Sequence, residues 1–284
     1  MIDRAPEAAE VAEELTEERA RAVLESEGHA TREIQDLTLH ILAVTDVAGP
    51  FVRIRGRLDG TVVHSDWTLP NLAVRIAVPA IDGPEPASRI YTVRSFDPTT
   101  EEIEIDILRH QHDSPMMRWI AAVRPGEAVA IVGPRPHFVP DYESGRPALM
   151  LADDSAVAAL YSIFRQWPDE AEGGAYVRTA HPEVIDELEA PAGVVVHRID
   201  EPLLTAARRA PLGCTLWAAG ERREMRAIRD YFRTEVGLPR GDVRPYGYWQ
   251  AETDSTAVDK RRLAHFSTLL ERGEPVADVD DLDI

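Results

Sequence analysis

The pattern of predicted secondary structure changes once along the chain, near residue 146, and this change constrains the fold more than any other feature. From about residue 37 to residue 145, short runs rich in β-branched residues follow one another, with Asp-Gly, Gly-Pro and Pro-Gly pairs between them. Such runs predict strands, and their number and spacing predict an antiparallel β-barrel. The runs are LTLHILAVTDV, FVRIRGRL, NLAVRIAVPA, RIYTVRSFD, EEIEIDILRH and AVAIVGP.

After residue 146, strand-like and helix-like segments alternate. PALMLA precedes the helical pattern DDSAVAALYSIFRQW, TLWAAG precedes ERREMRAIRDYFRTE, and GAYVRTA, GVVVHRI and VRPYGYW have the composition of strands. This alternation predicts an α/β domain whose parallel sheet carries helices on its faces. We therefore expect an N-terminal helical extension at 1–36, a β-barrel domain at 37–145 and an α/β domain at 146–284, which ends in a helix and an acidic tail.

Both ends of the chain carry helical patterns. Residues 6–28 show a thin apolar stripe among many Glu and Arg residues, and residues 256–272 show a second stripe that ends before Gly273. We expect the first helix to be an appendage or an interface element, because it lacks residues that would carry chemistry. The sequence leaves the oligomeric state open between monomer and dimer.

Composition excludes several classes of function. The net charge is −19, from 31 Lys and Arg residues against 50 Asp and Glu residues, whereas a nucleic-acid-binding protein needs a basic surface. The acidity either leaves a local arginine patch to attract an anionic partner or only keeps the surface soluble. No apolar run is long enough for a membrane span, and the acidic N-terminus does not resemble a secretion signal. Cys214 is the sole cysteine, so no intrachain disulfide is possible, which fits a reducing cytosol. From charge, apolar runs and cysteine count together, we expect a cytoplasmic protein without nucleic acid or stable membrane association.

The strongest local signal for chemistry is the strand RIYTVR at residues 89–94. Alternate residues of a strand share a face, so Arg89, Tyr91 and Val93 point one way, and Thr92 and Arg94 the other, unless a bulge re-aims them. A flavin needs a cation for its pyrophosphate, an aromatic face for its ring and a hydrogen-bond partner near its reactive nitrogen. Arg, Tyr and Thr supply all three. An ordinary surface strand whose Tyr packs on a neighbour has the same pattern.

RIYTVR resembles the flavin motif of the siderophore-interacting proteins, which are related to the ferredoxin reductases. Further segments resemble motifs of that family in order and spacing, from residue 89 to about residue 250. WAAGE at 217–221 and GYW at 247–249 form the most family-specific pair. The other segments are IDILRHQHDSPMMRW, RPGEAVAIVGPR and LADDSAVAAL.

The resemblance implies a ferredoxin-reductase-like flavoenzyme, with FAD on the barrel, NADH or NADPH on the α/β domain, and a ferric siderophore as substrate. Reduction of Fe(III) releases the iron, because oxygen ligands hold Fe(II) more weakly, and it needs no side-chain acid or base. The implied FAD contacts are Arg89, Tyr91, Thr92, Val93, Arg94, Asp106, Leu108, His110, Ser114, Met116 and Met117. The implied residues on the nicotinamide side are Asp153, Asp154, Ser155, Gly220 and Glu221.

The sequence departs from the family pattern at several of these positions. Gln111, Ser114 and Ala152 stand where the family has Gly, and Met116-Met117 replaces an Ala-Ser pair. The larger side chains bear on how tightly the phosphates of the cofactor bind, although the backbone amides remain available.

Some candidate residues also have a purely structural interpretation. Asp153, Asp154 and Ser155 are typical of a helix N-cap, and Glu221 suits the first turn of a helix. His110 and His112 form an HxH pair on a predicted strand, a spacing that can chelate a metal, but no third ligand is evident and we expect no metal site. We interpret Trp217 and Trp249 as core residues.

A large, often anionic siderophore needs basic residues near the flavin edge. The candidates are Arg75, Arg244, Lys260 and Arg262, although the run from Lys260 to Arg262 also suits a solvated helix face. Two alternative functions stay open. One is a siderophore- or flavin-binding protein without turnover, and the other is a flavin- or ferredoxin-linked reductase with another acceptor.

Overall fold

The computed structural model describes most of the chain between residues 34 and 251. The expected helices at 6–28 and 256–272, with Lys260 and Arg262, lie outside the described residues, as do Gln111 and His112. The described ranges are 34–60, 64–78, 87–110, 113–142, 145–210 and 213–251.

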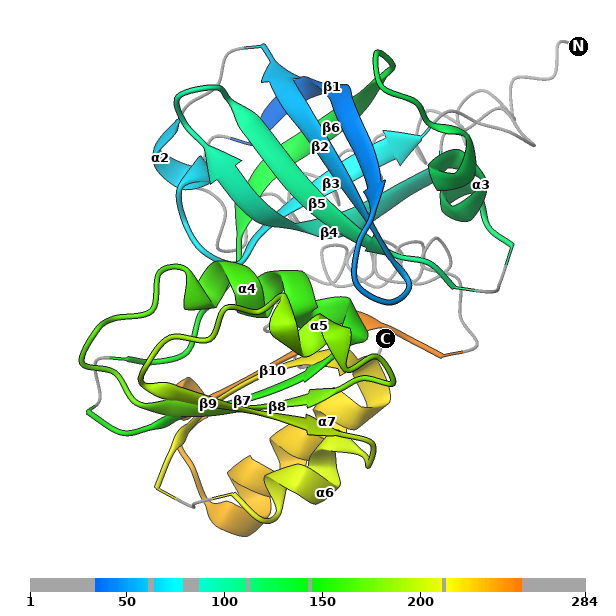
Figure 1. Ribbon diagram of the computed structural model, residues 1–284. Coiled ribbons are helices and arrows are strands. Elements are labelled where there is room, and N and C mark those ends of the chain that lie inside the picture. Colours follow the sequence, from blue (N-terminus) through cyan, green and yellow to red (C-terminus); the bar gives the residue numbers. More distant parts are fainter. Residues whose placement is uncertain are drawn as a thin grey trace, which may run out of the picture. The chain divides into compact units, whose positions relative to one another are not determined.

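The first part of the described chain is a closed antiparallel barrel with the strand order β1-β2-β5-β4-β3-β6 (Figure 1). Inward and outward residues alternate along its strands, so that in β5 Ile103, Ile105 and Ile107 are fully buried while the acidic residues between them face outward. The predicted barrel is confirmed. Its strands are β1 (Gln35–Asp46), β2 (Phe51–Asp59), β3 (Leu72–Val78), β4 (Ala87–Asp97), β5 (Glu102–Leu108) and β6 (Ala128–Pro136).

Two helices belong to the barrel, the short α2 (His64–Trp67) and α3 (Pro115–Ala122). Pro115 suits the first turn of α3, because a helix start leaves its amide without a partner in any case. The Ser114 hydroxyl caps the helix by accepting a hydrogen bond from the Met117 amide. Met116, Trp119 and Ile120 then pack into the barrel core.

The second part is a five-stranded parallel sheet with the order β11-β10-β7-β8-β9, which confirms the predicted α/β architecture. Every residue of β7 is buried, as expected for a parallel strand covered on both faces. The strands are β7 (Ala148–Asp153), β8 (Gly173–Arg178), β9 (Val194–Ile199), β10 (Thr215–Glu221) and β11 (Val243–Trp249). The helical segments are η1 (Asp154–Ala156), α4 (Val157–Phe164), α5 (Glu183–Asp186), α6 (Leu203–Ala207), α7 (Arg222–Asp230), η2 (Tyr231–Val236) and η3 (Arg240–Asp242).

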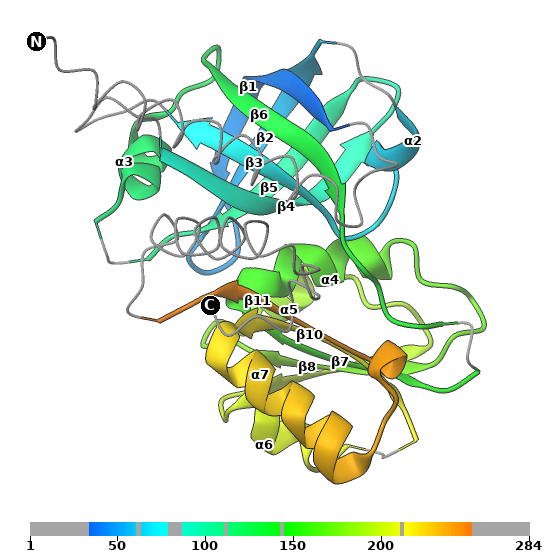
Figure 2. The same ribbon diagram turned by 180° about the vertical axis from the view of Figure 1, so that it is seen from behind.

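The helices cover the two faces of this sheet in pairs, α4 with α5 and α6 with α7 (Figures 1 and 2). Alternate residues of β7 serve the two sides: Met150 and Ala152 pack with α4 and α5, whereas Leu149 and Leu151 pack with α6 and α7. Among the described residues, no helix has the length and apolar character needed to cross a membrane.

The strand order places a topological switch point between β7 and β10. From β7 the chain moves outward through β8 and β9, and it then returns to the other side of β7 to form β10 and β11. The loops that follow β7 and β10 therefore diverge and leave a crevice at the carboxyl ends of these strands, where ligands of open parallel sheets bind. Asp153 and Glu221 end these two strands.

Candidate active site

Strand β4 carries the RIYTVR segment and presents different residues to its two sides. Val93 is buried in the barrel core, and Tyr91 packs against that core at its margin. Burial raises the pKa of the Tyr91 phenol well above its usual range, although the nearby Arg89 acts in the opposite direction. Arg94 instead contacts an element of the α/β domain. This strand therefore joins the barrel core to the second domain.

Arg89 and Arg75 meet at Ser88. The Arg89 guanidinium donates to the Ser88 carbonyl oxygen at 2.7 Å, and that of Arg75, on the neighbouring β3, donates to the Ser88 Oγ at 2.9 Å. The structure thus brings a predicted FAD contact and a predicted substrate contact together. Two cations on adjacent strands suit an anionic ligand such as a phosphate.

The start of α3 is a candidate anion site with limited capacity. Pro115 has no amide proton, and the Ser114 hydroxyl already accepts from the Met117 amide at 3.2 Å. The anion-binding role predicted for this turn therefore rests mainly on the amide of Met116. The His110 amide lies 3.5 Å from the Met117 sulfur. Strand β5 ends at Leu108, so His110 lies beyond the strand. The prediction that the HxH pair lies on a strand is therefore wrong for His110.

Arg94 and Asp106, both predicted as FAD contacts, bind each other in a buried ion-pair cluster. Arg94 donates to Asp106 Oδ2 at 3.0 Å and to the Glu187 carbonyl oxygen at 2.9 Å, and it lies 3.5 Å above the Tyr161 ring centre. Arg53 makes two further bonds to Asp106, at 2.7 and 3.0 Å, and one to the Glu187 carboxylate at 3.1 Å. The cluster ties three barrel strands to α4 and to the segment after α5. Sequence reasoning missed Arg53, Tyr161 and Glu187.

At the switch point, the Asp153 carboxylate joins the ends of three strands. Its Oδ1 accepts from the Ser155 amide at 2.9 Å, and its Oδ2 accepts from the Glu221 amide at 3.0 Å and from the Trp249 indole nitrogen at 2.8 Å. Gly220 leaves room for this arrangement, because a Cβ there would lie 2.6 Å from Asp153 Oδ2. The capping interpretation of Asp153 is confirmed, and the same bonds shape the crevice.

Two more carboxylates flank the crevice. Glu221 caps α7 by accepting from the Glu224 amide at 3.0 Å and also accepts from the Ala251 amide at 3.3 Å. Burial raises the pKa of Asp154, although a hydrogen bond from Thr179 opposes this effect. These acidic groups keep the crevice rich in hydrogen-bond acceptors, which suits ribose hydroxyls better than phosphates.

The segments WAAGE and GYW meet in one polar network. Trp217 of WAAGE donates to the Phe138 carbonyl oxygen at 3.1 Å, and Asn71 donates to the same oxygen at 2.7 Å. Tyr248 of GYW donates to Asn71 Oδ1 at 3.1 Å. Trp217 is fully buried, as predicted. The structure shows a different environment for Trp249, which is 46% exposed, so its interpretation as a core residue is wrong.

Arg244 lies apart from Arg75, on β11. It donates to the Val139 carbonyl oxygen at 2.8 Å and to the Gly241 carbonyl oxygen at 3.2 Å, and it lies over the exposed ring of Phe138 at 5.4 Å. Lys260 and Arg262, the other predicted substrate contacts, are outside the described residues.

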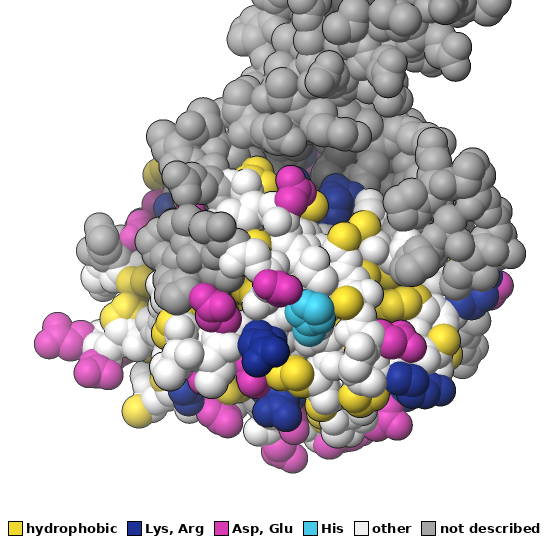
Figure 3. All heavy atoms as spheres, turned by 90° about the horizontal axis from the view of Figure 1, so that it is seen from above, with side chains coloured by type: hydrophobic (Ala, Val, Ile, Leu, Met, Phe, Trp, Pro, Cys, Tyr) yellow, Lys and Arg dark blue, Asp and Glu magenta, His cyan; other side chains and the backbone are white. Residues whose placement is uncertain are grey.

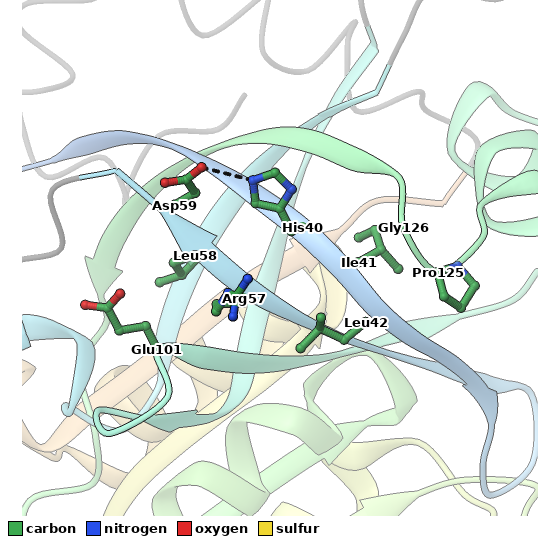
Figure 4. A pocket seen from close by; sticks show the side chains of 9 residues that line it. All are labelled: His40, Ile41, Leu42, Arg57, Leu58, Asp59, Glu101, Pro125 and Gly126. Atoms are coloured by element: carbon green, nitrogen blue, oxygen red, sulfur yellow. Dashed lines mark hydrogen bonds and ion pairs between the residues drawn. The ribbon is translucent and has the colours of Figure 1, made fainter.

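The barrel also has a hollow of about 660 Å³ that lies away from these residues (Figure 4). Strands β1 and β2 line it, with Glu101 and the Pro125-Gly126 turn at its margin, and the lining residues His40 and Asp59 hydrogen-bond each other at 3.0 Å. In the closed strand order, β5 on one side and β6 with β3 on the other separate it from β4. On the described part of the face in Figure 3, acidic and basic side chains are interspersed, and no single-sign patch stands out.

A closed antiparallel barrel joined to an open parallel sheet with an acceptor-rich switch point defines a two-domain flavin reductase architecture. Residues 65–138 match the siderophore-interacting FAD-binding domain, and residues 146–252 match the siderophore-interacting protein domain. The chain is 33% identical over 263 residues to the ferric acinetobactin reductase of Acinetobacter baumannii, covering 89% of this chain and 92% of the relative. The chain belongs to the siderophore-interacting protein family.

Two further comparisons agree with this assignment. The structure of the siderophore-interacting protein from Acinetobacter baumannii superposes with a TM-score of 0.79 at 34% identity, covering 84% of this chain and 99% of that one. The ferric vibriobactin reductase ViuB of Vibrio cholerae is 25% identical over 190 residues, which are 63% of this chain and 70% of the relative. The barrel therefore contains an FAD-binding domain, and the groups on β4 and at α3 fit that cofactor: a guanidinium, a phenol ring, a hydroxyl and a helix-start amide.

Proposed function

We propose that this chain is an FAD-dependent ferric-siderophore reductase of the cytoplasm that takes electrons from NADH or NADPH and releases Fe(II). The observation that carries the proposal is the RIYTVR strand, which lies in a matched FAD-binding domain of a chain similar over 89% of its length to a ferric acinetobactin reductase. Both alternatives from the sequence, a binding protein without turnover and a reductase with another acceptor, become outcomes of the test.

The residues of β4 and α3 divide the work of holding FAD. Arg89 and the amide of Met116 would hold the pyrophosphate, Tyr91 would lie against the flavin ring, and the Thr92 hydroxyl would hydrogen-bond its reactive nitrogen. When bound, FAD supplies the conversion of a two-electron donor into one-electron steps. Arg94 and Asp106 act indirectly, by fixing β4 against the second domain.

The switch point between β7 and β10 would receive the nicotinamide cofactor. Asp153 holds the ends of β7, β10 and β11 together, and Ser155 and Glu221 stand at the starts of the two helical segments that flank the crevice. The lack of a side chain at Gly220 keeps the strand end close to Asp153. The protein's part is to orient the donor, since no side-chain acid or base is needed for hydride transfer.

The substrate side of the proposal rests on charge. Fe(III) is a hard cation that anionic oxygen ligands hold tightly, and many such complexes are themselves anionic. Because the net charge of the chain is −19, attraction has to be local, and charges beyond about 8–10 Å are screened at physiological salt. Arg75, beside Arg89, is a described cation that can serve, and Arg244 is a second.

The first experiment measures turnover in purified protein. Bound flavin should give two absorption bands in the near-ultraviolet and blue, NADH or NADPH should bleach them without oxygen, and a ferric catecholate or hydroxamate should restore them while a chromogenic chelator traps Fe(II). A stable spectrum with no bleaching by either nicotinamide would favour a binding protein. Bleaching without Fe(II) release would favour another acceptor.

The second experiment tests the FAD contacts. Arg89→Ala removes a charge-assisted hydrogen bond to phosphate worth roughly 1.5–3 kcal/mol, so FAD should bind about ten- to a hundredfold more weakly. Arg55→Ala is the matched control, because Arg55 is a barrel arginine whose side chain is 52% exposed and pairs only with Glu102 in the described structure. Equal FAD affinity of the two variants, measured by fluorescence titration of the flavin-free protein, would contradict the assignment of Arg89.

A further inference from the structure

The end of β8 carries a cation that the proposed function does not use. Arg178 is the last residue of β8, which pairs with β7 on the side away from β10. In open parallel sheets that bind dinucleotides, a side chain near the end of the second strand reads the 2′ position of the adenosine ribose. A carboxylate there holds the hydroxyl of NAD, whereas an arginine accommodates the phosphate of NADP. A cation at this position would therefore favour NADPH if it faced the ligand alone.

The Arg178 guanidinium is, however, already held by two carboxylates. It donates from Nη1 to Glu224 Oε2 at 2.7 Å, and its Nη2 lies 3.8 Å from Asp153 Oδ2. The side chain of Arg178 is 29% exposed, and those of Glu224 and Asp153 are 13% and 7% exposed, so water screens these contacts less than at an open surface. Arg178 is thus a neutralised cation in a fixed position.

This bridge links the two sides of the switch point. Arg178 comes from β8, Asp153 ends β7, and Glu224 lies in the first turn of α7, which follows β10. Glu224 is fixed in turn, because its amide donates to the Glu221 carboxylate at 3.0 Å, and the N-terminus of α7 stabilises its negative charge. The bridge therefore lies at the crevice in which a dinucleotide would bind.

The groups joined by these bonds have an excess of negative charge. Asp153, Glu221 and Glu224 contribute three carboxylates, and Arg178 contributes the single guanidinium among them. Arg222, which also starts α7, has its side-chain stem beside β11, on the other side of β10 from β8. A phosphate monoester, which carries about −1.5 to −2 charge at neutral pH, would enter this group against like charge. A ribose hydroxyl would enter without that cost and could donate to a carboxylate oxygen.

We propose that Glu224 is a specificity-determining residue, which neutralises Arg178 and thereby makes the switch point prefer NADH over NADPH. The inference rests on the proposed function, which places a nicotinamide cofactor in this crevice but leaves open which one. The preference has two parts. The paired Arg178 offers the 2′-phosphate of NADPH no net attraction, and the surplus carboxylates favour the bare ribose hydroxyl of NADH.

The first measurement is binding without electron transfer. NAD⁺ and NADP⁺ differ only in the 2′-phosphate, and each is titrated calorimetrically into the FAD-loaded protein. We expect the parent to bind NAD⁺ at least about tenfold more tightly than NADP⁺, because repulsion between charges a few ångströms apart is only partly screened. Added salt should reduce this ratio. A parent that binds NADP⁺ as tightly as NAD⁺, or more tightly, would overturn the inference.

Glu224→Gln tests the residue itself. Glutamine keeps the size of the side chain and removes its charge, so Arg178 becomes available to the 2′-phosphate and the ratio should shift about tenfold toward NADP⁺. In combination with Arg178→Gln the gain should disappear, because the guanidinium that would meet the phosphate is gone. Asp200→Asn is the matched control, since it also removes a negative charge beside an arginine: Asp200 binds Arg198 at 2.6 Å and is exposed. The control should leave the ratio unchanged.

Flavin reduction separates failure of this inference from failure of the proposed function. Stopped-flow mixing without oxygen compares the rates at which low concentrations of NADH and NADPH bleach the flavin. Similar rates with both would keep the function and overturn the preference. Bleaching by neither would overturn the function and leave the binding ratio to decide the preference, and binding of neither nucleotide would overturn both.

The variants decide the role of Glu224 separately. An unchanged ratio in Glu224→Gln, or an equal shift in Asp200→Asn, would overturn it. If Glu224→Gln does not fold, the parental ratio and its salt dependence still decide whether charge at this crevice selects NADH.

Discussion

The buried cluster around Arg94 gives the sharpest prediction about stability. Arg94 is buried, with only 4% of its surface exposed. Arg94→Met keeps most of the length of the side chain but removes its guanidinium. The variant loses the bonds to Asp106 and to the Glu187 carbonyl oxygen, at 3.0 and 2.9 Å, and the contact with the Tyr161 ring. The carbonyl oxygen and the Asp106 carboxylate each lose a donor.

The expected cost follows from what remains of the cluster. Removing one partner of a buried ion pair costs about 3–5 kcal/mol, because the other charge is left without compensation. Arg53 still makes two bonds to Asp106, at 2.7 and 3.0 Å, so the loss should fall near the lower end. A loss of about 3 kcal/mol corresponds to a fall of about 6–12 °C in melting temperature for a folded unit of this size.

Thermal unfolding of the flavin-free protein, combined with FAD titration, distinguishes two roles of Arg94. Arg55→Met is the control, since it removes a side chain that is 52% exposed and lies 3.6 Å from Glu102, and it should cost less than about 1 kcal/mol. Equal melting temperatures for the two variants would refute the structural role. If Arg94→Met instead melted like the parent but bound FAD more weakly, Arg94 would be the direct FAD contact that the sequence predicts.

Two further predictions concern the crevice. Gly220→Ala places a Cβ 2.6 Å from the Asp153 carboxylate, so it should destabilise the protein by roughly 1–3 kcal/mol and slow flavin reduction by NAD(P)H. A parental melting temperature together with a parental rate of flavin reduction in stopped-flow measurements would contradict this. Burial raises the pKa of Asp154 in the folded state above its unfolded value, so its favourable contribution is present at low pH and is lost as pH rises through the folded pKa. Asp154→Asn should therefore melt higher than the parent at pH 7 and lose this advantage near pH 4, and a lower melting temperature at pH 7 would argue against it.

The fold is predictable from the sequence because its signals are local. The alternation in β5 places three isoleucines inside and acidic residues outside, and the continuous apolar run of β7 matches a strand buried on both faces. Motif order then identifies the family, and both domain models match the segments that carry those motifs.

The partners of the site residues are not predictable in the same way. Arg53 and Glu187 look like ordinary surface charges in their own segments, and only the closed barrel and the packing of α4 and α5 bring them to Arg94 and Asp106. Asn71 lies in a turn before β3 whose side-chain bonds depend on residues far along the chain. Local patterns hold no information on such contacts. The sequence therefore predicted Arg94 and Asp106 as ligand contacts and not as partners of each other.

A bulge in strand β11 gives the residues of GYW different partners. Its pairing with β10 shifts between Gly220–Gly247 and Glu221–Trp249, so Tyr248 is an extra residue at a bulge. The bulge lets consecutive side chains serve different partners: Tyr248 reaches Asn71 in the barrel, while Trp249 donates to Asp153 at the switch point. Gly247 permits the close approach of the first residue of α7, because a Cβ there would lie 3.0 Å from Arg222. A register change of one residue would break the bond of Tyr248 to Asn71 and that of Trp249 to Asp153 together.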